Sequence, residues 1–315
     1  MCQISQLKYQ QDNTFTGTYR LRKPVKAISR SNTPYMACTL EDATGSLKVY
    51  LWGEESTCAV SDMDLVTATC SMRRFNDEWI ADIVNVEKYT SIPENPLDLI
   101  PDSFCPKPEL LVELRNLVDS LSHNGIRQFV ISVLTDDEIL LPFVRLPASK
   151  NHHHAQSGGL LEHSLGSAIK VADVMGKDHE QTELAIVGAL FHDVAKVRTL
   201  AAEGKLTPTG YLIGHDFMTL EVLAPHLKTL DKTYPDIAIA LRYIWSWNIN
   251  PKKSSKSSIS CTALAEIVTG IDRFDTALQV DKEAFQDKPE WQKSTKYKGT
   301  SFRWRPSMEA KRVAA

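Results

Sequence analysis

The spacing of apolar residues along the chain changes its period once. From about Phe15 to Tyr89, apolar and polar positions alternate, as in YMACTLEDATGSLKVYLWG (35–53) and LVTATCSMRRFNDEWIADIVNVEKY (65–89). A period of two is typical of half-buried strands. From ELLVELRNLVDSLS (109–122) onward the period is helical. The sequence therefore predicts a β-rich region followed by an all-α region.

Two turn sequences order the strands of the first region. Asp42-Ala43-Thr44-Gly45 predicts a hairpin turn whose glycine can take a positive φ, and Asn76-Asp77-Glu78 predicts a second turn. Residues 53–62 connect the two hairpins. Five short strands in this arrangement favour a small barrel of the oligonucleotide/oligosaccharide-binding type, the OB-fold. The expected fold class is multidomain β plus α, a five-stranded OB-fold barrel followed by an all-α domain.

A proline-punctuated stretch separates the two regions. Prolines at positions 93, 96, 101, 106 and 108 are incompatible with a regular helix or a central strand. We therefore expect an OB-fold domain at residues 1–90, a proline-rich linker at 91–108, an all-α domain at 109–285 and a basic, aromatic tail at 286–315.

Composition narrows the class of protein. The 315 residues carry 43% hydrophobic and 24% charged side chains and a formal net charge of -3, which is typical of a globular protein. The apolar runs are too short to cross a bilayer and the polar N-terminus lacks a signal-peptide core, so we expect a cytoplasmic protein without a membrane partner. Six cysteines without CxxC spacing favour buried, reduced thiols over a zinc knuckle or a disulfide framework.

Histidines are concentrated in one part of the helical region. Seven of the nine fall between His152 and His215. His192 and Asp193 are adjacent in ALFHDVAKV, with His163 upstream and Asp272 far downstream. Imidazole and carboxylate ligands from separate helices suit a hard or borderline divalent cation in an octahedral site. We expect His192 and Asp193 on one helix, with the Lys196 ammonium one turn onward and within reach of the same site.

Four segments, in this order, carry a family resemblance: NHHHAQSGGLLEHS, ALFHDVAK, GHDFMTLEVL and GIDRFDTAL. They resemble the HD superfamily of metal-dependent phosphohydrolases. With a preceding OB-fold that includes TLEDATGSLKVYLW, the chain resembles the YhaM-type 3′-5′ exoribonucleases. The resemblance implies one or two divalent ions, Mn²⁺ first, with Mg²⁺, Fe²⁺ or Co²⁺ as alternatives. The ligands that it implies are His163, His192, Asp193 and Asp272, together with His215 as the histidine that binuclear members use for a second ion.

One segment departs from that pattern. YhaM-type relatives carry Ser-His-His-Gly where this chain reads Ser246-Trp247-Asn248-Ile249. Three explanations stay open: a second ion held by the His152–His154 cluster, a mononuclear site, or a site with reduced or lost catalytic power. For Trp245 and Trp247 we expect core packing rather than a stacking wall.

The expected catalytic roles follow from metal-assisted hydrolysis. Asp193 would orient the attacking water, and Lys196 with one of the three clustered imidazoles, which we take as His154, would stabilise the developing anion. The neighbouring carboxylates Glu162, Asp216 and Asp275 are expected to be inert side chains on solvated helix faces.

Aromatic and basic residues interleave in two places, which is a pattern of single-strand binding. In the barrel they are Trp52, Arg73, Arg74 and Phe75, against the alternative that part of this set is core. In the tail they are Lys298, Arg303 and Trp304, against the alternative of a flexible tail or a homo-oligomer contact.

These expectations combine into a divalent-metal-dependent phosphodiesterase that trims single-stranded RNA or DNA, as a 3′-5′ exoribonuclease does. The NHHHA and GGLLEH segments also resemble the MobH-type conjugative relaxases, which suggests a DNA-processing role as an alternative. A non-catalytic nucleic-acid-binding protein with a degenerate HD site is the third interpretation.

Overall fold

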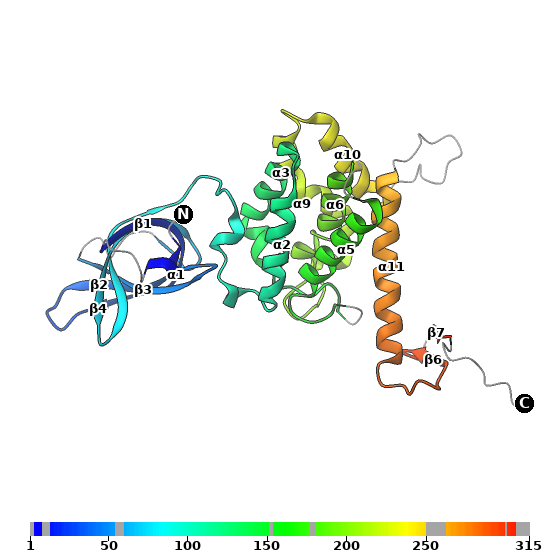
Figure 1. Ribbon diagram of the computed structural model, residues 1–315, viewed down its shortest axis with the longest axis horizontal. Coiled ribbons are helices and arrows are strands. Elements are labelled where there is room, and N and C mark those ends of the chain that lie inside the picture. The colour runs from blue at the N-terminus through cyan, green and yellow to red at the C-terminus, as the bar shows by residue number, and fades with distance from the viewer. Residues whose placement is uncertain are drawn as a thin grey trace, which may run out of the picture. The chain divides into compact units, whose positions relative to one another are not determined.

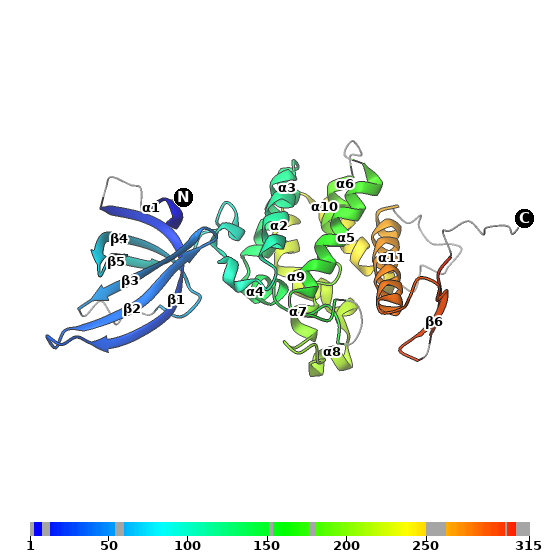
Figure 2. The ribbon, with the colours of Figure 1, turned by 60° about the horizontal axis from the view of Figure 1, so that its bottom comes forward.

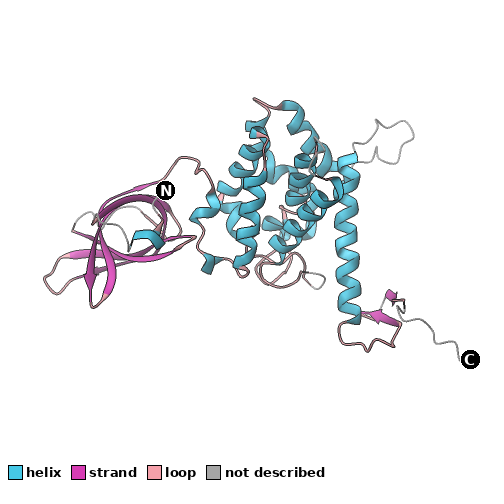
Figure 3. Ribbon diagram, in the orientation of Figure 1, coloured by secondary structure: helices cyan, strands magenta, loops and turns pink. Residues whose placement is uncertain are grey.

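The computed structural model describes residues 3–7, 13–53, 60–150, 154–176, 181–249, 263–299 and 301–306. The chain forms two compact units, Met1–Ser122 with Val130–Leu140 and His123–Phe129 with Leu141–Ala315. Strands dominate the first unit and helices the second (Figures 1 and 3).

Five strands of the first unit close into a barrel in the order β1-β2-β3-β5-β4, with β1 also paired to β4 (Figure 2). Its neighbouring strands are antiparallel except for β3 and β5, which pair in parallel through Val49 and Ala81. The predicted OB-fold is thereby confirmed. The strands are β1 (Thr14–Ile28), β2 (Pro34–Asp42), β3 (Gly45–Trp52), β4 (Leu65–Phe75) and β5 (Glu78–Lys88), preceded by the short helix α1 (Ile4–Leu7).

Alternation along the strands builds the barrel core. In β2 and β4 every second residue is buried, because successive side chains of a strand point to opposite faces. The resulting core contains Tyr19, Leu21, Met36, Leu40 and Leu51, each at most 1% exposed. The alternate residues, on the other face of the same strands, are mostly half-buried, and one end of each strand is exposed.

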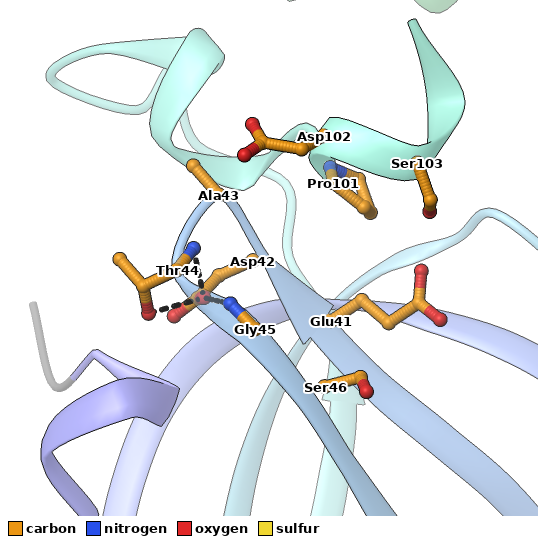
Figure 4. A pocket seen from close by; sticks show the side chains of 9 residues that line it. All are labelled: Glu41, Asp42, Ala43, Thr44, Gly45, Ser46, Pro101, Asp102 and Ser103. Atoms are coloured by element: carbon orange, nitrogen blue, oxygen red, sulfur yellow. Dashed lines mark hydrogen bonds between the residues drawn. The ribbon is translucent and has the colours of Figure 1, made fainter. Parts of the chain in front are cut away.

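The two predicted turns behave differently. Asn76 and Asp77, with φ of 50° and 63°, form the two-residue turn between β4 and β5 as expected. Gly45, by contrast, does not take a positive φ, so that part of the prediction is wrong. Instead the Asp42 carboxylate caps the turn by accepting the backbone N–H groups of Thr44 at 2.7 Å and Gly45 at 3.0 Å (Figure 4). The turn is therefore stabilised by hydrogen bonds to the Asp42 side chain, where we expected the conformational freedom of Gly45 to allow it.

The proline-rich segment is ordered and belongs to the first unit. It forms two short 3-10 helices, η2 (Pro96–Leu99) and η3 (Asp102–Phe104), and buries Leu97, Leu99 and Ile100 completely. The Asn95 side chain caps η2 by accepting the Leu97 N–H at 3.1 Å. The compact units therefore divide the chain later than residue 108, and the expected domain limits stay a prediction.

The helices that follow carry the candidate site. Among them α5, α10 and α11 pack against α6, whose residues are mostly buried. Gly188 of α6 makes this close approach possible, since a Cβ there would lie 3.0 Å from Ile244 and 3.4 Å from Val268. The helices are α2 (Pro108–Ser120), α3 (Asn124–Thr135), α4 (Asp137–Phe143), α5 (Gly159–Met175), α6 (Thr182–Phe191), α7 (Lys196–Thr199), α8 (Pro208–Leu212), α9 (His215–Leu230), α10 (Pro235–Ser246), η4 (Trp247–Ile249) and α11 (Ala263–Phe285).

The expected tail contains a folded hairpin. Strands β6 (Ser294–Tyr297) and β7 (Ser301–Trp304) pair antiparallel and lie against the C-terminal end of α11 (Figure 1). Tyr297 packs in a small apolar cluster with Val280, Ala284 and Phe285 of that helix. Residues 294–304 are therefore part of the helical unit rather than a loose extension.

Two expectations from composition can be compared with the structure. Within the described part of the chain, no helix is both long and apolar enough to span a bilayer. Cys38, Cys70 and Cys105 are buried thiols, as predicted. Burial raises the pKa of the Cys70 thiol to about 12, which keeps it protonated and unreactive.

Candidate metal centre

The first residue of the site is His163, which lies on α5. That helix begins at Gly159 directly after Gly158, whose φ of 77° turns the chain sharply into it, as the sequence suggested. Gly159 is required for a second reason: a Cβ at this position would collide with the carbonyl oxygen of His154. The preceding loop is held down because that same carbonyl accepts the Ala148 N–H at 2.9 Å. His163 is thus presented from a rigid helix start, with its side chain 1% exposed.

The other residues come from three separate places in the chain. His192 and Asp193 do not lie within a helix, contrary to expectation, because α6 ends at Phe191 and α7 begins only at Lys196. They occupy the turn between these helices, so that both side chains can face the same point. Asp272 lies in the middle of α11, and His215 is the first residue of α9.

Four donor atoms from these segments converge. His163 Nε2 lies 3.2 Å from His192 Nε2, 3.4 Å from Asp193 Oδ2 and 3.2 Å from Asp272 Oδ1. His192 Nε2 lies 3.5 Å from Asp193 Oδ2 and 3.4 Å from Asp272 Oδ1. Ligand atoms about 2.1 Å from a common ion lie about 3.0 to 3.4 Å apart in octahedral or tetrahedral geometry. The spacing of the His163, His192 and Asp272 atoms is therefore that of a set that could hold one ion, and Asp193 Oδ2, which is also paired with Lys196, borders this set.

Hydrogen bonds on the far sides of both rings assign their tautomers. His192 Nδ1 donates to the Ala189 carbonyl at 2.7 Å, and His163 Nδ1 donates to Asp275 Oδ2 at 3.0 Å. In the neutral rings the two Nε2 atoms are then unprotonated. Two nitrogen lone pairs and two carboxylate oxygens therefore face one another, and a cation between them would satisfy all four.

In the absence of that cation, a proton on His163 supplies positive charge between the same atoms. Burial of His163 disfavours its charged form, but the hydrogen bonds that it donates to the carboxylates of Asp193, Asp272 and Asp275 outweigh this effect and raise the pKa of His163 to about 11. Burial also opposes ionisation of Asp272, yet the imidazoles of His163 and His192 hold the pKa of this carboxyl well below its usual range. The site thus attracts positive charge strongly.

Asp193 is the most connected carboxylate of the centre. Its Oδ2 accepts from the Lys196 ammonium at 2.5 Å, and its Oδ1 lies 3.1 Å from His215 Nε2. Although burial opposes its ionisation, Lys196 and the neighbouring histidines hold the pKa of Asp193 well below the usual range. A pocket of about 50 Å³ opens beside it and is lined by His192, Asp193, His215, Asp216, Ile244, Trp245, Val268, Thr269 and Asp272.

A second group of residues, behind His163, was missed from the sequence. Asp275 is only 8% exposed and accepts from His163 Nδ1 and, at 2.8 Å, from the Lys170 ammonium. His154 lies 3.4 Å from the same carboxylate through Nε2 and 2.8 Å from Glu162 through Nδ1. The expectation that Asp275 and Glu162 are solvated and inert is therefore wrong for Asp275 and incomplete for Glu162. Helical spacing could have found Asp275, since it lies three residues after Asp272 on the same helix.

This arrangement changes what His154 can do. Its imidazole contacts carboxylates on the Nδ1 side of His163, and it does not line the pocket beside Asp193. His154, His163 and Asp275 form a second group whose atoms could hold an ion, but the Lys170 ammonium already supplies positive charge to Asp275. His152 and His153 lie outside the described residues.

The segment that departs from the family pattern is part of the core. Trp245 stacks on Phe129 with ring centroids 6.1 Å apart, and its Nε1 donates to the Gly188 carbonyl at 2.9 Å. Trp247 is likewise buried. Core packing, the expected role, is confirmed for both tryptophans, and Trp245 also lines the pocket beside Asp193.

On the barrel, aromatic rings gather on the solvent face of β2 and β3. Trp52 lies 5.0 Å from the ring of Tyr35 and 6.0 Å from that of Tyr50. Arg73 extends over Tyr50 at 5.8 Å and over Phe75 at 5.9 Å. Asp82 links Trp52 and Arg73 on this face. Its carboxylate accepts hydrogen bonds from Trp52 Nε1 at 2.9 Å and from Arg73 Nε at 2.6 Å.

Arg74 takes another direction from the same strand. Its guanidinium lies 5.5 Å from the ring of Trp79, across the β4–β5 pair. Trp52, Phe75 and Trp79 all keep more than a third of their surface exposed. The predicted barrel residues are therefore on the surface and not in the core.

Comparison with known proteins agrees with this architecture. A family model described as "Putative helicase" matches residues 109–200. The curated 3′-5′ exoribonuclease YhaM of Bacillus subtilis is 20% identical over 274 residues, covering 84% of this chain and 86% of that protein. The YhaM protein of Listeria monocytogenes is 22% identical over 281 residues, with 85% and 87% covered. That of Halalkalibacterium halodurans is 22% identical over 217 residues, with 66% and 67% covered.

Among solved structures, the second OB-fold domain of replication protein A from Methanococcus maripaludis aligns with 30% of this chain and 98% of that domain, at 16% identity and a TM-score of 0.25. The resemblance stated from the sequence is confirmed by the curated relatives. Over more than four fifths of its length, the chain is similar to 3′-5′ exoribonucleases named YhaM.

Proposed function

We propose that this protein is a divalent-metal-dependent nuclease that degrades single-stranded RNA from its 3′ end. The convergence of His163, His192 and Asp272 carries the proposal, because their three donor atoms lie 3.2 to 3.4 Å apart and could hold one cation, with Asp193 Oδ2 3.4 to 3.5 Å from the two imidazoles. The names of the curated relatives supply the reaction class.

The metal ligands in this proposal are those four residues, which together offer two imidazole nitrogens and two carboxylate oxygens. Such a mixed set suits Mn²⁺, and Mg²⁺, Fe²⁺ or Co²⁺ are compatible with it. A bound ion of this kind lowers the pKa of water and neutralises phosphate oxygens. His215 Nε2 lies 3.1 Å from Asp193 Oδ1, whereas Lys196 contacts Oδ2. From there His215 would be a ligand of a second ion.

The protein's own groups then position the reactants. Asp193 Oδ2 lies within the donor set and would accept a hydrogen bond from the attacking water. Lys196, held on the same oxygen and 13% exposed, would place positive charge beside the developing phosphorane. Because their charges are fixed before substrate arrives, these groups need little reorganisation during the reaction.

His154 takes a different role from the one expected. Since it contacts Asp275 and Glu162, we assign it to positioning: it supports the carboxylate that orients His163. Lys196, whose ammonium is paired with Asp193 at the edge of the centre, is then the remaining candidate for stabilising the anion, although it is not among the residues that line the pocket.

Substrate binding is assigned to the aromatic face of the barrel. Trp52 and Phe75 offer rings on which bases can stack, and Arg73 and Arg74 supply charge for phosphates. Stacking tolerates any base, so this face would bind single strands with little sequence preference. Sequence-independent binding is what a degradative nuclease requires.

A DNA-processing enzyme is the second candidate. The match of residues 109–200 to a family described as a helicase, and not as a ribonuclease, favours it, because that range includes His154, His163, His192 and Asp193. The replacement of an imidazole by the buried Trp247 favours the third candidate, a non-catalytic binding protein.

One experiment separates the three. Purified protein is incubated with 5′-labelled single-stranded RNA or DNA, each with Mn²⁺, Mg²⁺ or a chelator. A metal-dependent ladder that shortens from the 3′ end of RNA is the expected result. A single internal cut in DNA would favour the second candidate, and tight binding without products in any metal would favour the third.

A further inference from the structure

The hairpin β6–β7 has two chemically distinct faces. In its register Lys296 lies opposite Phe302, and Ser294 lies opposite Trp304. Alternation along the strands therefore places Lys296, Phe302 and Trp304 on one face and Tyr297 with Arg303 on the other. Phe302 is 68% exposed and Trp304 is 64% exposed, whereas Tyr297 is 9% exposed. We call the face of Lys296, Phe302 and Trp304 the outer face.

The inner face accounts for the folding of the hairpin. Tyr297 packs on α11 and its hydroxyl donates to Glu283 at 2.6 Å. Arg303 pairs with Asp281 of that helix at 3.6 Å. Arg305, just beyond β7, lies over the Phe285 ring at 4.6 Å. The predicted nucleic-acid residue Arg303 is thus occupied with packing, and the two large outer rings are not needed to hold the hairpin in place.

The local charge indicates what the outer face could bind. Residues 291–306 contain five basic side chains, at positions 293, 296, 298, 303 and 305, and no acidic one. Arg303 and Arg305 are engaged with α11, which leaves Lys296 on the outer face and Lys298 at the turn. The Lys298 ammonium lies 4.9 Å from the Tyr297 ring at the turn. Exposed aromatic rings among basic side chains are the pattern with which proteins hold single-stranded nucleic acid.

The size of the outer face argues against a second copy of the chain as its ligand. Two strands of four residues cover only about 13 Å by 10 Å. A stable protein interface needs about 800 Å² per partner. Two rings in alternate positions of one strand are, in contrast, enough to stack one or two bases.

We propose that the outer face binds the single-stranded substrate several nucleotides away from the metal centre. This inference rests on the proposed function, because it takes the substrate of the centre as its ligand. Asp272 and Ala284, which packs against Tyr297, are twelve residues apart on α11. At 1.5 Å per residue they lie about 18 Å apart, or about five nucleotides at a stacked spacing of 3.4 Å. A strand shorter than this cannot reach both places.

The test is the dependence of binding on strand length. Fluorescence anisotropy is measured in a chelator, which prevents turnover, with labelled single-stranded RNA of about three and about twelve nucleotides. The double variant Phe302→Ala/Trp304→Ala should bind the longer strand at least about fivefold more weakly and the shorter strand by a smaller factor, because a strand that cannot reach both places has no joint contact to lose. The matched control is Val174→Ala/Ile239→Ala, which removes two exposed apolar side chains elsewhere in the same unit.

A second variant guards against a misfolded hairpin. Lys296→Glu keeps both rings and the whole inner face, and it should also weaken binding of the longer strand and flatten its salt dependence. Equal loss for both lengths, or no loss in either variant, would overturn the proposal. So would a change from dimer to monomer in light scattering with unaltered binding, which would assign the face to a second copy.

The outcome is separable from that of the proposed function. Binding is measured without catalysis, so a length-dependent loss would support the outer face even if no RNA is cleaved. If the unmodified protein cleaves RNA and the variants bind RNA normally, the role of the outer face is rejected and the proposed nuclease function is not.

Discussion

The barrel face and the proposed metal centre differ in how their residues are brought together. On the barrel, Tyr35, Trp52 and Phe75 come from consecutive strands, and each ring adds its own contact. The metal centre joins His163 to Asp272, more than a hundred positions away, and each ligand depends on the others being in place. Loss of one ring should therefore weaken the protein gradually, whereas loss of one ligand should stop it. The predictions below test this difference in order of expected effect.

Removing Asp193 should have the largest effect. Asp193→Ala deletes one of the four donor atoms and leaves the Lys196 ammonium without its closest partner. We expect cleavage to fall by about 100- to 1,000-fold, as when a preorganised electrostatic group is lost. Single-turnover cleavage and the metal content of the purified variant are the measurements. Asp173→Ala, on the exposed face of α5, is the control and should behave normally. Full activity of Asp193→Ala with intact metal content would refute the assignment of the centre.

Changing the residue behind His163 should have a smaller effect on the same centre. Asp275→Asn retains an acceptor for His163 Nδ1 but loses the charge that also binds Lys170. We expect metal affinity to fall about 10- to 100-fold, as for other residues that orient a ligand. Competition with a fluorescent chelator measures it. At saturating metal the KM for RNA should be unchanged, and a raised KM would indicate instead that Asp275 contacts substrate.

Removing a ring from the barrel should weaken binding without stopping the reaction. Trp52→Ala loses a base-stacking surface and the contact with Asp82. We expect binding of single-stranded RNA to fall about 5- to 150-fold, since one stacked base contributes about 1 to 3 kcal/mol. The cleavage rate at saturating RNA should be nearly unchanged. Val84→Ala, an exposed change on β5, is the control, and a similar loss in that variant would show that the barrel is generally sensitive.

The smallest expected effect is on the salt dependence of RNA binding. Arg74→Ala should lower the slope of log affinity against log salt concentration by about 0.7, the value for one phosphate contact to a single strand. Arg73→Ala should lower it less, because the Arg73 charge is already paired with Asp82. Titration of binding over a range of salt concentrations measures both. Equal slopes in the two variants would mean that the Asp82 pair opens when RNA binds.

The sequence predicts the barrel well because the information there is local. Alternation marks the strands, and Asn76-Asp77 marks one turn by its tolerance of positive φ. The turn at Gly45 was misjudged because glycine is permitted, and not obliged, to adopt such a conformation, and Asp42 satisfied the backbone instead. Local rules of this kind identify which residues can turn the chain, but the side-chain hydrogen bonds decide how it turns.

Prediction of the centre was less complete because its geometry is not local. The motif identified the ligands that converge, yet it placed His192 and Asp193 inside a helix that ends at Phe191. Asp275 looked like any charged residue of a helix surface, and its burial depends on packing between α5 and α11. The same applies in the hairpin, where the register alone shows that Lys296 is on the outer face and that Arg303 is not.

Gly188 limits which residues can occupy this position during evolution. Its missing side chain lets Ile244 and Val268 come within contact of α6, the helix that delivers His192 and Asp193, and its carbonyl accepts the Trp245 indole. A methyl group there would lie 3.0 Å from Ile244 and 3.4 Å from Val268, so these side chains would have to shift by a few tenths of an ångström. Substitution of this buried glycine should therefore be rare among sequences that keep the site.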